Sequence, residues 1–277
     1  MRNSRRILKT GALAVSVTIA FAVFVFYGKT ADRTTFTVTR VLPQIAVGSF
    51  DGNLTKYSTV IEIVNAGPAS VNVSANFYKT TDGTASTLSF ATNLTAAPAI
   101  TGGVLASTAL DAGKVLVITG NTATTGTVNW AKIQATGRVS IATFFEIRDA
   151  LTNVLYSRVG VTASPPNMSK FVIPRVRNVA NAFDVAFALV NTGSTAASYT
   201  ATLKDVTGAT LSTKTGQSLA AGAQTAKFAS EFFGLTNEPA GTSYSFVVFE
   251  SASPQFGAIA VAFEGAAQTS LPVDQLQ

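Results

Sequence analysis

The feature that most constrains the fold of this chain is a pattern that occurs twice. "EIVNAGPASVNVSANFY" (62–78) and "ALVNTGSTAASYTATLK" (188–204) each give an apolar run, Val-Asn, a small residue, Gly and then alternating residues. Alternation with a period of two predicts strands with one buried and one exposed face. The sequence therefore predicts two copies of one β-rich unit.

Further landmarks follow in the same order in both copies. They are Pro43 and Pro174, Gly83 and Gly208, Leu110 and Leu219, and Glu146 and Glu264. The separation of equivalent residues is 126 at the two Asn, 109 at the two Leu and 118 at the two Glu, so the copies differ by insertions. We expect the extra stretch 91–108 of the first copy to lie on the surface, and 229–235 of the second to form a short helical turn.

Composition agrees with an all-β fold. Hydrophobic residues make up 47% of the 277 residues and charged residues 12%, which is enough for one large domain or two ordinary ones. Short alternating runs at 59–65, 70–78, 127–135 and 139–147 are bounded by Gly, Asn, Asp or Ser. Such spacing predicts antiparallel sheets packed as sandwiches.

The N-terminus has the pattern of a membrane-targeting signal. Four cations precede residue 10, and residues 11–28 carry no charge. Cleavage after residue 28 or 31 would place Phe26 or Lys29 where a small residue is needed. We expect residues 1–31 to be an uncleaved signal anchor with a hydrophobic helix at 11–28, and a cleaved signal peptide is the alternative.

The predicted domains follow from the repeat. The first sandwich covers residues 35–162 and the second covers 171–277. Residues 163–170 contain two consecutive prolines, which cannot donate to a strand ladder, and form the predicted linker.

The repeated motif also resembles a known class of domain. It reads Val64-Asn65-Ala66-Gly67, Asp82-Gly83 and 110–113 in the first copy, and Val190-Asn191-Thr192-Gly193, 205–208 and 219–222 in the second. This pattern is similar to the immunoglobulin-like sandwich repeats of bacterial exported and surface proteins, including adhesion-related repeats. The resemblance covers about residues 35–273. It implies the fold far more than any activity, and no matched position is catalytic.

The motif residues have a structural interpretation. We assign Asn65, Gly67, Asn191, Gly193, Gly83 and Gly208 to turns between strands. Asn and Gly accept positive φ cheaply, and an Asn side chain can bond the backbone of its own turn.

Residue types limit the chemistry of the chain. It has no His and no Cys, so triads with an imidazole base and the usual zinc sites are excluded. Glu146 and Asp149 are the remaining candidates for a catalytic carboxylate pair, although Asp149 opens the turn-like "RDALTN". Asp51 and Asp82 lie in isolated loops that lack a calcium-binding pattern. We expect no enzyme activity, no cofactor and no metal.

Aromatic residues offer contact sites. The single Trp, Trp130, lies in an alternating run and is expected to be buried in a sandwich. Phe144-Phe145 and Phe232-Phe233 cannot both point inward on a strand, so Phe144, Phe232 and Phe233 are candidates for exposed contacts.

These observations favour a structural or interaction protein outside the cytoplasm, with a protein or glycan partner. The alternative is a carbohydrate-binding or accessory module that works beside an enzyme. The formal charge of +6 comes largely from the first nine residues, so we expect no nucleic-acid binding. The predicted location is the membrane, facing the periplasm or exterior through an anchor at 11–28, or secretion if the anchor is cleaved.

Overall fold

The computed structural model of this protein describes residues 38–95, 99–120, 124–178, 182–235, 243–265 and 267–276. Thr35–Gln277 form one compact unit. The described residues fold as antiparallel strands with one short helix, which confirms the predicted all-β class. The predicted hydrophobic helix at 11–28 lies outside the described residues. Among those that are described, no helix has the length and apolar character needed to span a membrane.

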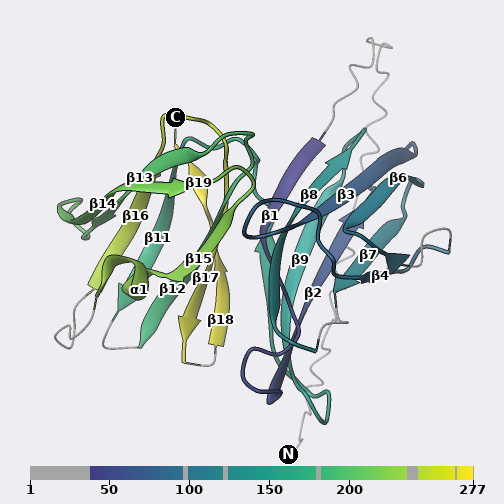
Figure 1. Ribbon diagram of the computed structural model, residues 1–277, viewed down its shortest axis with the longest axis horizontal. Coiled ribbons are helices and arrows are strands. Elements are labelled where there is room, and N and C mark those ends of the chain that lie inside the picture. The colour runs from purple at the N-terminus through teal and green to yellow at the C-terminus, as the bar shows by residue number, and fades with distance from the viewer. Residues whose placement is uncertain are drawn as a thin grey trace, which may run out of the picture. The chain divides into compact units, whose positions relative to one another are not determined.

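Two sheets form the first sandwich (Figure 1). One has the order β1 (Val38–Val47), β8 (Thr127–Ala135), β3 (Val71–Lys79) and β6 (Val104–Leu110). The other has the order β10 (Leu155–Thr162), β9 (Ser140–Asp149), β2 (Thr55–Val64), β7 (Val115–Gly120), β4 (Phe90–Thr92) and β5 (Ala99–Ile100). Buried side chains from both sheets, such as Phe77 and Ile61, share one core.

The second sandwich is built from one long ladder that folds over its own core. Its order is β14 (Thr210–Leu219), β13 (Ala197–Lys204), β16 (Ser243–Glu250), β11 (Lys170–Asn178), β12 (Phe183–Asn191), β17 (Phe256–Glu264) and β18 (Ala267–Leu271). In addition, β15 (Gln224–Phe228) pairs with β12, and β19 (Asp274–Gln275) pairs with β11. Phe249 on β16 and Phe187 on β12 meet in this core, so the two halves of the ladder form facing layers.

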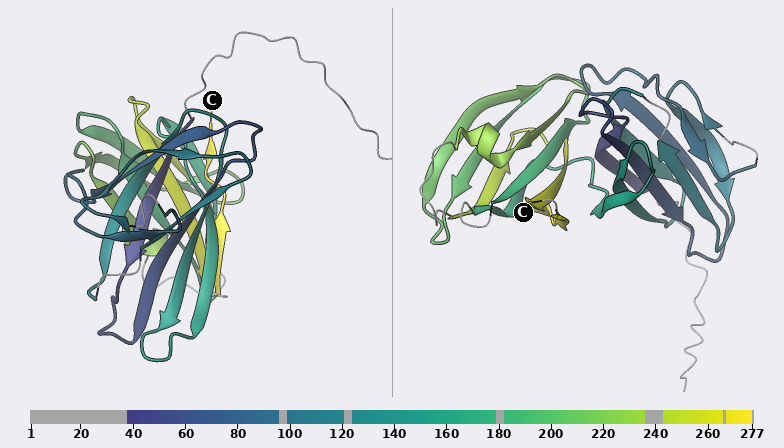
Figure 2. Two further views of the ribbon diagram at one scale, coloured as in Figure 1. Left: turned by 90° about the vertical axis from the view of Figure 1, so that its right-hand side faces the viewer. Right: turned by 90° about the horizontal axis from the view of Figure 1, so that it is seen from below.

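Most of the described residues of the insertion 91–108 are exposed, as expected for a surface stretch. The stretch nevertheless contains part of β4, all of β5 and most of β6. The reason is that it also contributes to the first core, where Ile100 on β5 is 1% exposed and Leu105 on β6 is 3% exposed. The second prediction is confirmed, since α1 (Ala229–Phe233) is a short helix that ends at Gly234. It lies at the margin between the layers of the second sandwich (Figure 2).

Equivalent prolines interrupt the first strand of each copy. The ladder of β1 shifts register between Leu42 and Ile45, around Pro43. The ladder of β11 shifts between Pro174 and Arg177. Proline has no N–H to donate, so a bulge is where a strand can hold it.

The predicted linker is held on both sides. Ser164 exchanges two backbone hydrogen bonds of 2.8 Å with Val41 of the first sandwich. Met168 is buried in the second core and bonds the backbone of Phe256. These contacts restrict the segment between the two cores.

Candidate interaction surface

The two motif asparagines lie fully buried at equivalent turns. The Asn65 side-chain amide donates to the carbonyls of Ala69 and Leu110, both at 2.8 Å, and its oxygen accepts from Gly67 N–H at 3.0 Å. Asn191 repeats this arrangement with Thr195, Leu219 and Gly193. The polar atoms of both side chains therefore form hydrogen bonds within the fold and link a turn to a neighbouring strand.

Two of the four motif glycines lack the expected positive φ. Gly83 and Gly208 are left-handed, with φ of 66° and 85°. Gly67 and Gly193 are not, and the constraint on them is space. A Cβ on Gly67 would lie 3.2 Å from the Asn65 side-chain oxygen, and one on Gly193 would lie 2.3 Å from the side chain of Gln255.

Gly83 belongs to a close contact between the two sandwiches. A Cβ on Gly83 would lie 2.6 Å from the Cα of Gly222, so the two backbones touch. Trp130 Nε1 donates to the Gly222 carbonyl at 2.8 Å, and its ring stacks on Tyr78. Trp130 is buried as expected, but against Val41 and Val190 between the sandwiches and outside either core.

The two candidate catalytic carboxylates have separate structural partners. Glu146 is buried on β9 and forms ion pairs with Arg148 at 3.0 Å and Arg158 at 2.5 Å. Asp149 accepts hydrogen bonds from Tyr156 and from the turn at Thr152. The hydrogen bond from Tyr156 is the first of several that hold the pKa of Asp149 well below its usual range.

Acidic side chains in the other loops also bond their own turns. Asp51 accepts from the Thr55 hydroxyl at 2.5 Å and from the N–H groups of Thr55 and Leu54. The Thr55 hydroxyl leads the causes that lower the pKa of Asp51 to about 2. Asp82 bonds Thr84 in the same way. No group of three acidic, His or Cys side chains suited to a metal occurs in the part of the chain that is described.

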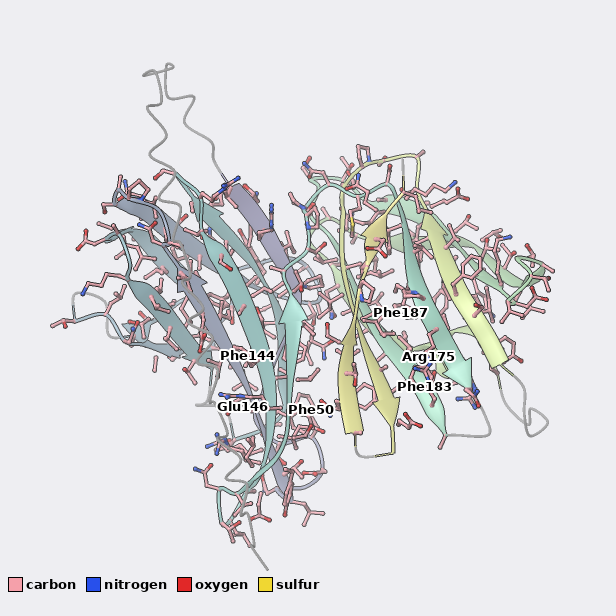
Figure 3. All side chains as sticks on the ribbon, turned by 180° about the vertical axis from the view of Figure 1, so that it is seen from behind. Phe50, Phe144, Glu146, Arg175, Phe183 and Phe187 are labelled. Atoms are coloured by element: carbon pink, nitrogen blue, oxygen red, sulfur yellow. The ribbon has the colours of Figure 1, made fainter. Side chains whose placement is uncertain are left out.

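The three aromatic side chains predicted to be exposed differ in their burial. Phe233 on α1 is only 6% exposed and lies in the second core, so the prediction that it is exposed is wrong. The helix turns Phe232 to the edge of this core, where it is half-buried. Phe144 is half-buried on the same side of the first sandwich as Glu146, with Arg158 over its ring at 5.1 Å (Figure 3).

Exposed apolar side chains gather instead at one end of the first sandwich. Of the eleven large apolar side chains that the described residues expose, six lie there. We call them the apolar patch: Phe50, Leu54, Leu151, Val154, Leu155 and Tyr156. Their exposed fractions run from 42% for Leu155 to 94% for Leu151.

Local structure explains why the patch forms. The loop after β1 and the β9–β10 turn meet at this end, since Thr55 pairs with Asp149 and the N–H of Ala150 donates to Leu54. Asp51 and Asp149 hold the two turns by the hydrogen bonds described above, which leaves the apolar side chains to point outward. Sequence reasoning missed the patch because residues 50–54 and 151–156 are far apart in the chain. The signal in the sequence that could have indicated the patch was the presence of apolar residues inside two predicted turns.

The patch continues into an apolar groove between the sandwiches, with a volume of about 450 Å³. On the first sandwich the groove is lined by Phe50, Tyr57 and Phe145, and on the second by Ala226, Phe228 and Phe263. Two edge-on ring pairs stiffen it, Phe50 with Tyr57 and Phe228 with Phe263. At the rim, Lys227 and Glu231 form an ion pair. In Figure 3, Phe50 lies on the side of the first sandwich that faces the second, and Phe187 lies on β12 of the second.

Comparison with known proteins adds little to this description. No family model and no curated protein matches the chain. Among solved structures, the pilus backbone RrgB from Streptococcus pneumoniae covers 80% of this chain and 98% of its own at 11% identity, with a TM-score of 0.14. Similarity at this level supports no statement about the present chain. Its own fold and surface define it as an all-β, sandwich-type protein with two cores, an apolar patch and an apolar groove.

Proposed function

We propose that this protein is a non-enzymatic, exported interaction protein of the bacterial cell envelope. It presents two immunoglobulin-like domains to a protein partner. The observation that carries the proposal is the apolar patch, because soluble surfaces rarely gather large apolar side chains unless they bind something. Burying Leu54 and Leu151 alone would contribute about 1.5–3 kcal/mol each.

The chemistry of the patch favours a protein over the other partner classes. Glu146 is paired with both Arg148 and Arg158. The carboxylates of Asp51 and Asp149 lie at the same end and Lys56 lies beside them on β2, so three carboxylates match three cations and no positive surface is left for phosphates or anionic lipids. Leu and Val side chains lack the hydrogen-bonding groups that sugar hydroxyls require. The exposed rings of Phe50, Tyr156 and Phe228 are the observation that supports the alternative, a carbohydrate-binding module.

The envelope location draws on the sequence alone, through the cations before residue 10 and the uncharged run 11–28. The test is expression in a bacterium with the native N-terminus, followed by fractionation and intact mass. A full-length mass in the membrane fraction supports an anchor facing the periplasm or exterior. A soluble species lacking about 28 to 31 residues supports cleavage and secretion. A full-length protein in the cytosol would refute export.

The interaction is tested with a variant of the patch. Leu54→Ser and Leu151→Ser are combined, and Val206→Ser serves as the control because Val206 is exposed on the second sandwich. Immobilised full-length proteins are incubated with solubilised envelope proteins and, separately, with envelope polysaccharides. We expect recovery of a specific protein to fall about tenfold with the double variant and to persist with the control. Equal recovery from both would contradict the proposal, and selective loss of a polysaccharide would favour the alternative.

A further inference from the structure

The two sandwiches differ in whether one equivalent sheet edge is paired with a further strand. In the first sandwich the outer edge of β7 is covered by β4, through the pairs Ala91–Thr119 and Thr92–Ile118. The covering chain continues at Asn93. Its N–H donates to the Val117 carbonyl at 3.2 Å, and its side-chain oxygen accepts from Val117 N–H at 2.9 Å. The outward backbone groups of β7 are therefore satisfied within the chain.

Strand β15 is the counterpart of β7. Val64, directly before Asn65, pairs with Val115 at the start of β7. Val190, directly before Asn191, pairs with Gln224 at the start of β15. Counting along both strands from these pairs, Ala226 occupies the position of Val117.

Among the described residues, the second copy has no strand in the position of β4. In the first copy β4 comes from the long connection between β3 and β6, but β13 and β14 are joined by residues 205–209 alone. Within the described residues, β15 pairs only with β12. Ala226, Lys227 and Phe228 are exposed, whereas Ile118, the counterpart of Lys227 on β7, is buried.

The outer edge of β15 is oriented to accept a strand. Gln224 N–H donates across this edge to the Thr80 carbonyl of the first sandwich at 2.8 Å. Because backbone groups alternate between the two edges of a strand, the N–H and C=O of Ala226 point to the same side as those of Gln224. The edge lines the apolar groove, where the aromatic side chains of the opposite wall exclude water from added hydrogen bonds.

We propose that β15 binds an extended strand from a partner protein, paired with it as β4 pairs with β7. The bound segment has apolar side chains at alternate positions, which face Phe50, Tyr57 and Phe145 across the groove. Lys227 and Glu231 neutralise each other at the rim, so an uncharged segment fits best. The inference rests on the proposed function in taking a protein as the partner. Of the apolar patch it uses only Phe50, and the patch variant changes Leu54 and Leu151 while the variants below change β15 alone, so the two proposals fail separately.

The first test uses the wild-type full-length protein and peptide probes. A capped, fluorescent heptapeptide of alternating threonine and valine is compared with two versions, N-methylated at every valine or at every threonine. Each version blocks the donors along one edge of the peptide. We expect the unmodified probe to bind. One N-methylated version should bind about tenfold or more weakly, whereas the other should bind with the affinity of the unmodified probe. Equal affinity of all three probes, or no binding, would overturn the inference.

The second test changes the protein. Ala226→Pro removes one outward N–H, which an edge strand tolerates, and Ala226→Ser keeps it. We expect the Pro variant to lose the probe and the Ser variant to retain it, with unchanged capture of the patch partner by both. Unimpaired binding to the Pro variant, with its fold verified by circular dichroism, would refute strand pairing. If sedimentation shows wild-type self-association that Ala226→Pro abolishes, the occupant is a second copy and the stated partner is wrong.

Discussion

At the scale of single residues, the structure assigns the repeated asparagines to the interior of turns. Asn65 and Asn191 are among the few polar side chains that the described residues bury completely. Each donates one buried hydrogen bond, Asn65 to the Leu110 carbonyl and Asn191 to the Leu219 carbonyl, so each is required where it stands. The sequence predicted a turn role, but burial depends on strands that pack over the turn from elsewhere.

Replacing Asn65 by Ala is expected to lower the free energy of unfolding by about 2–3 kcal/mol, because the Leu110 carbonyl is left buried without a donor. Asn191→Ala should cost a similar amount. Chemical denaturation measures both, and Asn72→Ala is the control because Asn72 is exposed. Equal stability of Asn65→Ala and Asn72→Ala would contradict the role of the buried amide.

The loop after β1 should respond to acid. The pKa of Asp51 falls from 3.8 to about 2 in the folded protein, so the ionised form favours the folded loop. This contribution is complete above the unfolded value and is lost as the pH falls through about 2. An NMR titration of the Asp51 carboxyl carbon should show the low midpoint, and Thr55→Val should raise it toward 3.8. Thr55→Ser keeps the hydroxyl and should leave the midpoint unchanged. If the Thr55→Ser variant shifted the midpoint as much as Thr55→Val, the hydroxyl would not be the cause of the low pKa.

At the scale of elements, two glycine turns bring the sandwiches into contact. The turn after β3 places Gly83 against Gly222, next to Trp130. The two backbones approach this closely only because neither residue has a side chain. From the sequence, each glycine was recognisable only as a turn residue. The partner of a turn lies far along the chain, so periodicity carries no signal for it.

Gly222→Ala should separate this contact, because its Cβ would lie 2.6 Å from Gly83. Trp130 is the only Trp, so its fluorescence reports the change directly, and we expect a shift of emission to longer wavelength. Gly208→Ala is the matched control. It imposes a similar positive-φ strain, yet its Cβ meets nothing within 4 Å. Unshifted emission in Gly222→Ala would show that the contact is not held in solution.

At the scale of the whole molecule, two separate cores share the unit Thr35–Gln277. Phe77 is buried in the first core, where it stacks on Phe90, and Phe249 is buried in the second. The contacts between the sandwiches are smaller than either core, with Val41, Trp130 and Val190 forming one cluster. The predicted domain boundaries imply that each core unfolds by itself.

Calorimetry of core variants tests these boundaries. Phe77→Ala and Phe249→Ala should each cost about 3–5 kcal/mol. We expect two transitions, with each variant lowering the temperature of a different one. Val206→Ala, at a position that is 79% exposed, should move neither. A single transition that both core variants shift would mean that the two sandwiches unfold as one cooperative unit.

The sequence by itself determined the class of fold, the order of the landmarks and a short helical turn within 229–235. These depend on local alternation, turn residues and one internal repeat, all of which can be read within a window of a few residues. Only the tertiary structure decided that 91–108 contributes strands, that Phe233 is buried, and that an apolar patch and a groove exist. It also decided that β4 pairs with the outer edge of β7, whereas among the described residues no strand pairs with the outer edge of β15. Each of these outcomes depends on which distant segments share an edge or a core, and that is set by packing across the chain.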